Sequence, residues 1–354
     1  MPHRIGFCWD RMVSLENCIA AERTLAKNKK GNKMAQHIGQ NAEKYGKDLF
    51  EKLSAGEIVF HANKETTISD SYKGKERHLK IPCLEDQAVQ IAWLNIATPE
   101  IERRNYHYNC GSIPGAGQSR AVEALKKWLK DKKNKYGATM DIRRFYETCP
   151  HWVVMKGLNR IFKDKQFLYV AELILANMSD TGVGLAIGHP SSHWFANVAI
   201  MEIDHELKRR HPDVKFTRYM DNFGIVGKNK RHTRKAMLFI MESIEKDDMK
   251  IKRDWQFFPI AARGMTFLSY RFFNGYTLLT KPLMYRIARK MVRAEKRMSV
   301  HMAMGVVSYL GILKHCNSFN FKKDRVYTHI NQKYCRRLIS NASKNKLCRT
   351  PVGV

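Results

Sequence analysis

Residues 216–226 read Phe-Thr-Arg-Tyr-Met-Asp-Asn-Phe-Gly-Ile-Val. Two short apolar runs flank the pair Asp221-Asn222. Because adjacent Asx residues tolerate positive φ angles, the pattern predicts a β-hairpin with a tight two-residue turn at this pair and a carboxylate at its tip. Asx turns also occur in ordinary antiparallel sheets, so the hairpin alone does not indicate a function.

A second acid stands at the end of another predicted strand. Residues 136–146 read Tyr-Gly-Ala-Thr-Met-Asp-Ile-Arg-Arg-Phe-Tyr. The small and apolar residues suit a buried strand within 137–146, and Asp141 is expected where the strand ends and a helix begins. Two divalent cations about 3.5–4 Å apart need oxygen ligands from both sides. Asp141 beside Asp221 is therefore the minimum set of ligands for a two-metal site.

These two segments resemble motifs A and C of reverse transcriptases, and the resemblance extends over about residues 65–300. The pattern Ile187-Gly188-x-x-x-Ser192, followed by Phe-Ala-Asn, is most like prokaryotic enzymes of diversity-generating retroelements and of the related antiphage-defence group. Further segments resemble other family motifs in the family order: the fingers hairpin at 75–82, the Gly-rich connection at 109–117, the template-gripping block at 184–197, motif D at 249–252 and motif E at 267–270.

The resemblance implies an α+β fold of the right-hand polymerase type, with a small antiparallel sheet packed on helices in the palm. We expect an N-terminal basic helical region at 1–60, fingers at 61–135 with a hairpin turn at Lys73-Gly74, a palm at 136–275 with a fingers insertion at 150–185, and a basic helical thumb at 276–354. The N-terminal region fits either a basic arm for an RNA or a brace behind the fingers.

The implied chemistry is RNA-directed DNA synthesis, in which a primer 3′-hydroxyl attacks the α-phosphate of a nucleotide. The resemblance implies that Asp141 bridges two Mg²⁺ or Mn²⁺ ions, and that Asp221 and the backbone carbonyl of Ile142 complete their ligands. Asn222 stands where most family members carry a second Asp, which makes the motif a variant, Tyr-Met-Asp-Asn. The amide keeps an oxygen acceptor and removes one negative charge.

Substrate contacts are also implied residue by residue. Tyr146 lies five residues after Asp141, where the family has an aromatic ring that excludes a ribonucleotide 2′-hydroxyl. Deoxynucleotides are therefore the expected substrates, and an RNA-templated RNA polymerase is disfavoured. Other expected contacts are Lys75 and Arg77 with the triphosphate, Lys250 (or Lys252) as the acid for the leaving pyrophosphate, and Gly188, Ser192 and His193 with template and substrate.

The basic charge of the chain points to a polyanionic partner. Lys and Arg number 63 against 33 acids, a net charge of +30. Residues 281–354 hold seventeen Lys or Arg and two acids, so half of the net charge lies in this segment. It is helically patterned, and the simplest interpretation is a solvated basic face. Because it follows motif E, we expect instead a thumb helix that binds the primer–template duplex through Arg286, Arg289, Arg293 and Lys296, next to a primer-gripping Tyr270.

Composition limits the remaining choices. The 354 residues are 44% hydrophobic, and no run reaches the ~18–20 apolar residues of a membrane span. The eight cysteines are scattered without CxxC spacing, which predicts idle thiols in a reducing cytoplasm and disfavours a zinc site.

Expected partners are an RNA template, a DNA or RNA primer, dNTPs and a structured noncoding RNA, with an accessory protein or a homo-oligomer as further candidates and no membrane.

Departures from the family pattern leave alternatives open. Asn222 replaces an acid and His193 replaces a common Gln, which suggests a specialised enzyme. An antiphage-defence enzyme would use the same chemistry for another purpose. A polymerase-fold protein that has lost catalysis and serves as a nucleic-acid-binding subunit would explain the charge and Asn222, but not the persistence of Asp141, Tyr146 and Asp221 together.

Overall fold

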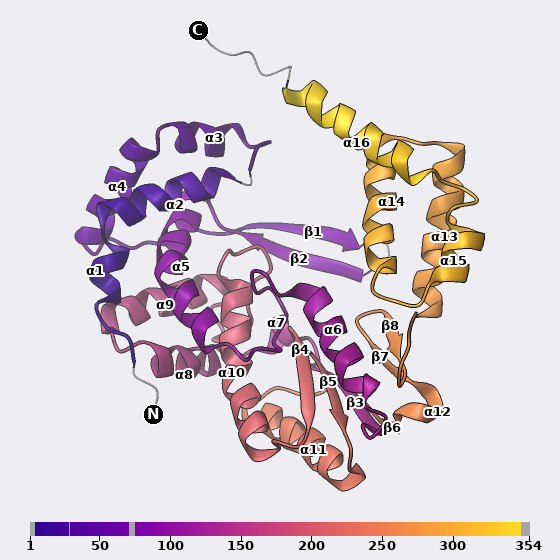
Figure 1. Ribbon diagram of the computed structural model, residues 1–354. Helices are drawn as coiled ribbons and strands as arrows, with labels where there is room; N and C mark the ends of the chain where they lie inside the picture. Colours follow the sequence, from indigo (N-terminus) through magenta and orange to yellow (C-terminus); the bar gives the residue numbers. More distant parts are fainter. Residues whose placement is uncertain (1–3, 28, 71–74, 348–354) are drawn as a thin grey trace.

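The computed structural model describes residues 4–27, 29–70 and 75–347, and Figure 1 shows helices grouped around three small antiparallel sheets. The predicted α+β class is confirmed. The predicted turn at Lys73-Gly74 lies outside the described residues. No helix in the described part of the chain is long and apolar enough to cross a bilayer.

The central four-stranded sheet, called the palm sheet here, has the order β4-β5-β3-β6, with antiparallel neighbours throughout. Helices α10 (Ser192–Arg210) and α11 (Lys230–Lys246) pack on each other, and α11 packs on β3 and β5. Apolar side chains of three strands enter the main core, as the hydrophobic patterning requires. The four strands of the palm sheet are β3 (Tyr136–Asp141), β4 (Lys215–Tyr219), β5 (Asn222–Gly227) and β6 (Gln256–Pro259).

The N-terminal half forms a helical body against this core. Trp93 of α5 (Leu84–Arg104) is fully buried, stacks on Phe167 at 5.0 Å between ring centroids, and donates its indole N–H to the Phe167 carbonyl at 3.0 Å. The contact ties α5 to α9 (Lys165–Met178). The other helices of the body are α1 (Cys8–Met12), α2 (Leu15–Lys27), α3 (Lys33–Gln40), α4 (Ala42–Ser54) and α8 (His151–Ile161).

Two further parts extend from the core. Strands β1 (Lys64–Asp70) and β2 (Lys75–Ile81) form a long hairpin that projects toward α14 in Figure 1. A second buried cluster joins α6 (Gly117–Lys130) to a three-stranded sheet and to the C-terminal helices. The C-terminal helices are called the thumb here. These elements are β7 (Met265–Phe267), β8 (Tyr270–Phe272), β9 (Thr277–Leu279), α12 (Ile260–Arg263), α13 (Lys281–Lys296), α14 (Val300–Leu313), α15 (Phe319–Arg325) and α16 (Gln332–Leu347).

The strand expected within 137–146 covers Tyr136–Asp141 and ends at Asp141, as predicted. Arg144 then adopts a left-handed backbone (φ 49°), and the short helix α7 (Phe145–Thr148) follows. Helix α5 continues through Pro99 to Arg104. Proline lacks one N–H donor, and the buried apolar face of α5 outweighs that loss here. Helices α3 and α4 meet at Asn41.

Candidate active site

The β4–β5 hairpin carries the predicted carboxylate, but its turn is displaced by one residue. Tyr219 pairs with Asn222, so the two turn residues are Met220 and Asp221. Met220 has the positive φ, 55°, and Asn222 is the first residue of β5. The prediction of a turn at the Asp221-Asn222 pair is therefore wrong by one position. Side-chain burial overrides turn propensity here, since Phe223 is fully buried and fixes the register of β5.

The strand pairing brings the polar residues of motifs A and C together. In the register between β3 and β5, Asp141 lies directly opposite Asn222. Immediately after β3, the Ile142 N–H donates to the Asp221 carbonyl at 3.1 Å. The Asn222 amide donates through Nδ2 to Asp221 Oδ1, also at 3.1 Å. The edge of the sheet therefore presents one carboxylate from each strand, together with an amide that orients the second carboxylate.

The motif D-like segment completes this edge. The Lys252 N–H donates to the Asp141 carbonyl at 2.8 Å, and the Lys252 ammonium contacts Asp141 Oδ1. Two residues earlier, the Lys250 carbonyl accepts the Arg143 N–H at 2.7 Å, while the Lys250 side chain is exposed. The structure thus places Lys252, and not Lys250, in contact with a predicted metal ligand.

Two close carboxylates with one ammonium counter-charge make a site suited to a divalent cation. Burial raises the pKa of Asp221, and the negative charge of Asp141 raises it further, whereas Lys252 acts in the opposite direction. The nearby donors are hard oxygens: the two carboxylates, the amide oxygen of Asn222 and backbone carbonyls. Mg²⁺ and Mn²⁺ prefer such oxygen ligands, so the residues present fit the metal that the sequence resemblance implies.

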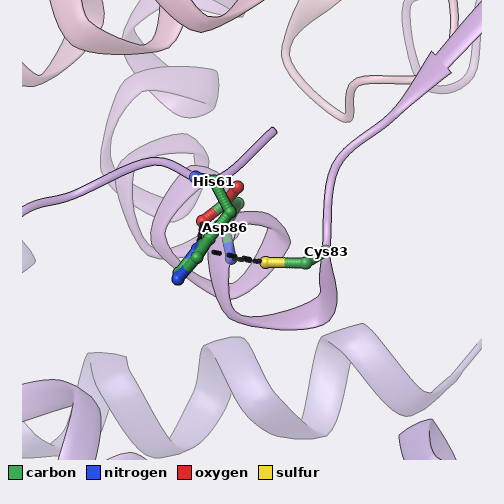
Figure 2. A group of neighbouring side chains, drawn as sticks. All are labelled: His61, Cys83 and Asp86. Carbon is green, nitrogen blue, oxygen red and sulfur yellow. Dashed lines mark hydrogen bonds and ion pairs between the residues drawn. The ribbon is translucent and has the colours of Figure 1, made fainter. Parts of the chain in front are cut away.

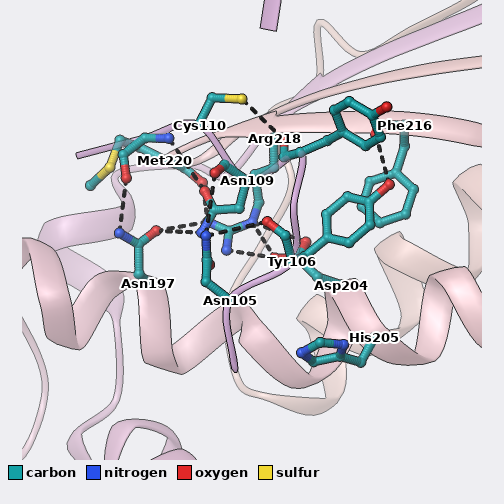
Figure 3. Close-up of polar contacts among 12 residues, drawn as sticks. Asn105, Tyr106, Asn109, Cys110, Asn197, Asp204, His205, Phe216, Arg218 and Met220 are labelled. Atoms are coloured by element: carbon teal, nitrogen blue, oxygen red, sulfur yellow. Dashed lines mark hydrogen bonds and ion pairs between the residues drawn. The ribbon is translucent and has the colours of Figure 1, made fainter. Parts of the chain in front are cut away.

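A buried ion pair supports the catalytic turn from beneath (Figure 3). Arg218 of β4 and Asp204 of α10 have no exposed side-chain surface, and the guanidinium makes three hydrogen bonds of 2.6–3.0 Å with the carboxylate. A further Arg218 nitrogen, Nη1, donates to the Met220 carbonyl at 2.9 Å. The backbone residue next to Asp221 is therefore tied to a buried, bidentate ion pair.

Amide side chains extend this network to the Gly-rich connection. Arg218 Nη1 also donates to Asn197 Oδ1 at 3.3 Å, and the same oxygen accepts a hydrogen bond from Asn109 Nδ2 at 3.0 Å. Asn197 Nδ2 in turn donates to the Gly111 carbonyl at 2.9 Å. A Cβ at Gly111 would lie 2.3 Å from the Met220 nitrogen, so only glycine allows this close approach to the turn.

This network was not predicted from the sequence, although a signal was present. Arg218 lies between Phe216 and Met220 at the two-residue spacing of a strand, and Asp204 lies at helical spacing from Ile200 and Leu207, so each charge falls on an apolar face. A charged residue at a buried position needs a partner. The sequence does not say which of the 33 acids would supply it.

Tyr146 lies close to the carboxylates. It is half-buried in α7, and its backbone carbonyl accepts the Leu185 N–H at 2.6 Å. Burial and the negative charge of Asp221 both raise the pKa of the Tyr146 hydroxyl. A phenol is neutral at physiological pH, and these effects keep the Tyr146 hydroxyl so.

The residues predicted to contact the template have different surroundings from one another. Gly188 (φ 124°) lies against β2, where a Cβ would meet the Lys80 carbonyl at 2.5 Å. Ser192 is buried, and its hydroxyl donates to the Ala186 carbonyl. The Ser192 hydroxyl is therefore engaged within the protein, and a contact of this residue with template stays a prediction. His193 lines a cavity of about 510 Å³ with residues of α2 and α5.

The predicted fingers and thumb contacts also differ in exposure. Arg77 is exposed on β2. The backbone of Lys75 lies opposite that of Asp70 in the β1–β2 register, at the start of that strand. Tyr270 is 2% exposed, and its hydroxyl donates to the Ile312 carbonyl of α14 at 3.0 Å. The side chain therefore joins β8 to α14, and its contact with nucleic acid stays a prediction. Of the predicted α13 cations, Arg289, Arg293 and Lys296 are exposed, whereas Arg286 is half-buried.

His61, Cys83 and Asp86 form a separate cluster at the start of α5, outside the carboxylate site (Figure 2). The buried Asp86 accepts the backbone N–H and the Nδ1 of His61, both at 2.9 Å. Cys83 Sγ accepts the Asp86 N–H at 3.4 Å and so caps the helix. These contacts hold the segment before β1 against α5, and both carboxylate oxygens of Asp86 accept hydrogen bonds from His61.

The fold is similar to that of several telomerases. Apo telomerase from Candida tropicalis superimposes with a TM-score of 0.50 and 12% identity, over 70% of this chain and 54% of that chain. The form of the Candida tropicalis enzyme truncated from the C-terminal domain superimposes with a TM-score of 0.49 and 12% identity, over 62% of this chain and 55% of that chain. Telomerase from Candida tropicalis in complex with a TWJ fragment of telomeric RNA superimposes with a TM-score of 0.48 and 12% identity, over 88% of this chain and 66% of that chain. This chain therefore spans roughly half to two thirds of those proteins, and the likeness concerns the fold.

The sequence comparison covers the catalytic region. No curated protein sequence matches the chain. The family model described as "Reverse transcriptase (RNA-dependent DNA polymerase)" matches residues 63–272, which is more than half of the chain and includes the β1–β2 hairpin, both carboxylates and β8. The predicted polymerase fold with a palm is confirmed by this match and by the telomerase likeness. The chain belongs to the reverse transcriptase (RNA-dependent DNA polymerase) family.

Proposed function

We propose that this protein is an RNA-directed DNA polymerase that makes cDNA by two-metal nucleotidyl transfer. The observation that carries the proposal is the β3–β5 register, which sets Asp141 opposite Asn222 and next to Asp221. Family membership alone would fit a protein that has lost catalysis. A lapsed site has no need to keep two carboxylates, a neutral aromatic ring and an ammonium group around one sheet edge.

The residues would divide the chemistry as follows. The carboxylates of Asp141 and Asp221 and the carbonyl of Ile142 would hold the metal ions. When bound, the ions supply positive charge to the α-phosphate and lower the pKa of the primer 3′-hydroxyl. The Lys252 ammonium contacts Asp141 and would lie near a leaving pyrophosphate, so Lys252 is proposed for the general-acid role that the sequence assigned to Lys250 or Lys252.

Asn222 gives this site its variant character. Its amide donates to Asp221, which an ionised Asp at the same position could not do. We propose that Asn222 orients the Asp221 carboxylate and lowers the affinity for one metal without abolishing it. An activity that depends strongly on metal concentration follows from this substitution.

Deoxynucleotides are the proposed substrates. The half-buried ring of Tyr146 lies near Asp221, where it would contact the sugar of a bound nucleotide and exclude a 2′-hydroxyl. Arg77 on the β1–β2 hairpin would bind the triphosphate, together with Lys75 of the same strand. Gly188 supports this arrangement, because its close contact with Lys80 joins the template-gripping block to that hairpin.

The proposed partners are an RNA template and a DNA or RNA primer. The pattern from Ile187 to Ser192 followed by Phe-Ala-Asn supports a place among the diversity-generating-retroelement and antiphage-defence enzymes, with a structured noncoding RNA as template. Cysteines without disulfides in the described chain support a reducing, cytoplasmic site of action.

Primer extension tests the proposal. Purified protein with Mg²⁺ or Mn²⁺ should extend a labelled primer on an RNA template with dNTPs. Asp141→Asn and Asp221→Asn should each abolish extension while primer–template binding persists, and Glu172→Gln, which removes one exposed charge from α9, should behave as wild type. Extension by either Asp variant at the wild-type rate would refute the mechanism. Binding without extension by wild-type protein would identify a nucleic-acid-binding subunit.

A further inference from the structure

A strongly basic cavity lies at the end of the palm sheet that is remote from the carboxylates. It has a volume of about 580 Å³. No acidic residue is among its described lining residues. Apart from Tyr136, Asn229 and Leu238, the lining consists of cations: Lys135, Lys228, Lys230, Arg231, Arg234 and Lys235.

The palm fold creates this cavity from two segments that are far apart in the sequence. Residues 130–135 contain four Lys and one acid, and residues 228–235 contain five Lys or Arg and no acid. The antiparallel pairing of β3 with β5 brings them together, with the Lys135 N–H donating to the Gly227 carbonyl at 3.1 Å. Asn229 then caps α11 by accepting the N–H groups of Arg231 and His232, so the first two turns of that helix display the second basic segment.

The charges of this cavity are poorly compensated compared with those at the end of α10. On α10, Arg209 and Arg210 both pair with Glu206 at 2.6–2.9 Å. In the cavity, the ion pair that the structure shows is Lys228 with Asp131, at 3.7 Å. Like charges held together repel one another, and the repulsion is relieved when a polyanion replaces the diffuse counterions.

The location separates this cavity from the catalytic edge. Tyr136 begins β3 and Asp141 ends it, so the cavity and the carboxylates lie about 17 Å apart along the strand at 3.3–3.4 Å per residue. Figure 1 shows α11 on the side of the palm sheet that faces away from the β1–β2 hairpin. A nucleic acid bound here would therefore not occupy the primer–template position at the catalytic edge.

The shape and chemistry of the cavity select among anionic partners. All six cations are exposed and flexible, which suits a phosphodiester backbone better than one small anion that needs fixed, buried donors. The surface is hollow, so a flat anionic bilayer would not reach its floor, whereas a nucleic acid strand would. Tyr136 and Leu238 add surface against which a ribose or a base can pack.

We propose that this basic cavity is a second nucleic-acid site, which binds the sugar–phosphate backbone of a folded RNA outside the primer–template cleft. Such a site anchors a structured RNA by its backbone while another part of an RNA is copied. The proposal goes beyond polymerisation and requires no catalysis, so it holds or fails separately from the proposed function.

Binding of a labelled RNA hairpin with a 20-base-pair stem tests the site, in wild-type protein whose cleft is saturated with an unlabelled DNA primer on an RNA template. The cavity variant carries Lys228→Gln, Arg231→Gln, Arg234→Gln and Lys235→Gln. The matched control loses the same charge at scattered exposed positions, through Lys163→Gln, Lys165→Gln, Lys208→Gln and Lys246→Gln. Log affinity is measured against log salt concentration for each protein.

The cavity variant should lose at least tenfold in hairpin affinity at 0.1 M salt, and its salt slope should fall by about 0.7–0.9 for each lost phosphate contact. The control variant should change much less, and primer extension by the cavity variant should persist. In unmutated protein, the hairpin should protect Lys135, Lys228, Lys230 and Lys235 from acetylation. Equal slopes for the two variants, absent protection, or protection by anionic vesicles but not by RNA would each overturn the proposal.

Discussion

The buried pair of Arg218 and Asp204 is expected to hold the catalytic turn in place, and Arg218→Met tests this. The variant keeps an unbranched apolar stem and removes every donor. It leaves the Asp204 carboxylate without its ionic partner in a position that has no exposed surface. Breaking a buried ion pair by removing one partner costs about 3–5 kcal/mol. For a chain of this length, that corresponds to a fall in Tm of about 4–7 °C.

A double variant separates stability from catalysis. Replacing both partners, Arg218→Met with Asp204→Leu, leaves no unpaired buried charge, so most of the lost stability should return. The hydrogen bond from Arg218 to the Met220 carbonyl, at 2.9 Å, stays lost. A hydrogen bond to a charged group contributes about 1.5–3 kcal/mol. If the bond positions Asp221 in the transition state, kcat should fall on the order of 10- to 100-fold.

The assay combines thermal unfolding with steady-state primer extension. Arg218→Lys serves as the intermediate case, because its ammonium keeps the charge but cannot contact Asp204 bidentately and also reach Met220. We expect low stability for Arg218→Met alone, and near-wild-type stability with low kcat for the double variant. A double variant that is both stable and fully active would refute the positioning role and leave the network as a stability element only. An Arg218→Met protein as stable as wild type would refute the assignment of a buried charge pair.

Four further predictions follow from the site and its surroundings. Asn222→Asp should lower the metal concentration needed for half-maximal extension, because a third carboxylate is added to the edge; a complete loss of activity would show that the site is built around the amide. Tyr146→Ala should raise ribonucleotide incorporation while Tyr146→Phe behaves as wild type, and an unchanged dNTP preference in the Ala variant would place sugar selection elsewhere. Neutralising the four predicted α13 cations should lower the slope of log duplex affinity against log salt by about 0.9 for each phosphate contact, whereas an unchanged slope would favour a solvated helix face. Burial raises the pKa of Glu22 from 4.5 to about 7 in the folded protein, so its ionisation removes stability as the pH rises from below 4.5 through 7. Glu22→Gln should therefore raise the free energy of unfolding by up to about 3 kcal/mol at pH 8 and give no such gain at pH 4, as urea titrations at both pH values would measure.

The order of motifs in the chain was enough to predict the polymerase fold and the two carboxylates at one sheet edge. The apolar residues on both sides of Asp221, and the small and apolar residues before Asp141, predict two strands. Because β3 pairs with β5, the acids at the ends of those strands meet. The helical pattern within residues 281–354 likewise predicted a helix, and α13 spans Lys281–Lys296.

Local propensity failed where tertiary packing opposed it. The Asp221-Asn222 pair favours a turn, yet Met220 adopts the positive φ. The fully buried Phe223, one position further along, sets the register of the whole strand. Tyr270 and Ser192 match family motifs, but each is buried and uses its hydroxyl in a contact within the protein. A motif specifies a residue type at a position, and packing then decides whether its side chain reaches solvent.

Only the tertiary structure identified the residues that support and extend the site. Arg218 finds Asp204 from another element, and Lys252 rather than Lys250 contacts Asp141, because both contacts depend on how the elements pack. The basic cavity likewise needs residues 130–135 and 228–235 to meet across the β3–β5 pairing. The sequence alone determined which residues carry charge and how apolar residues repeat along the strands and helices. The packing of the sheet decided which charges compensate one another and which converge, because both depend on distances in space that no spacing along the chain encodes.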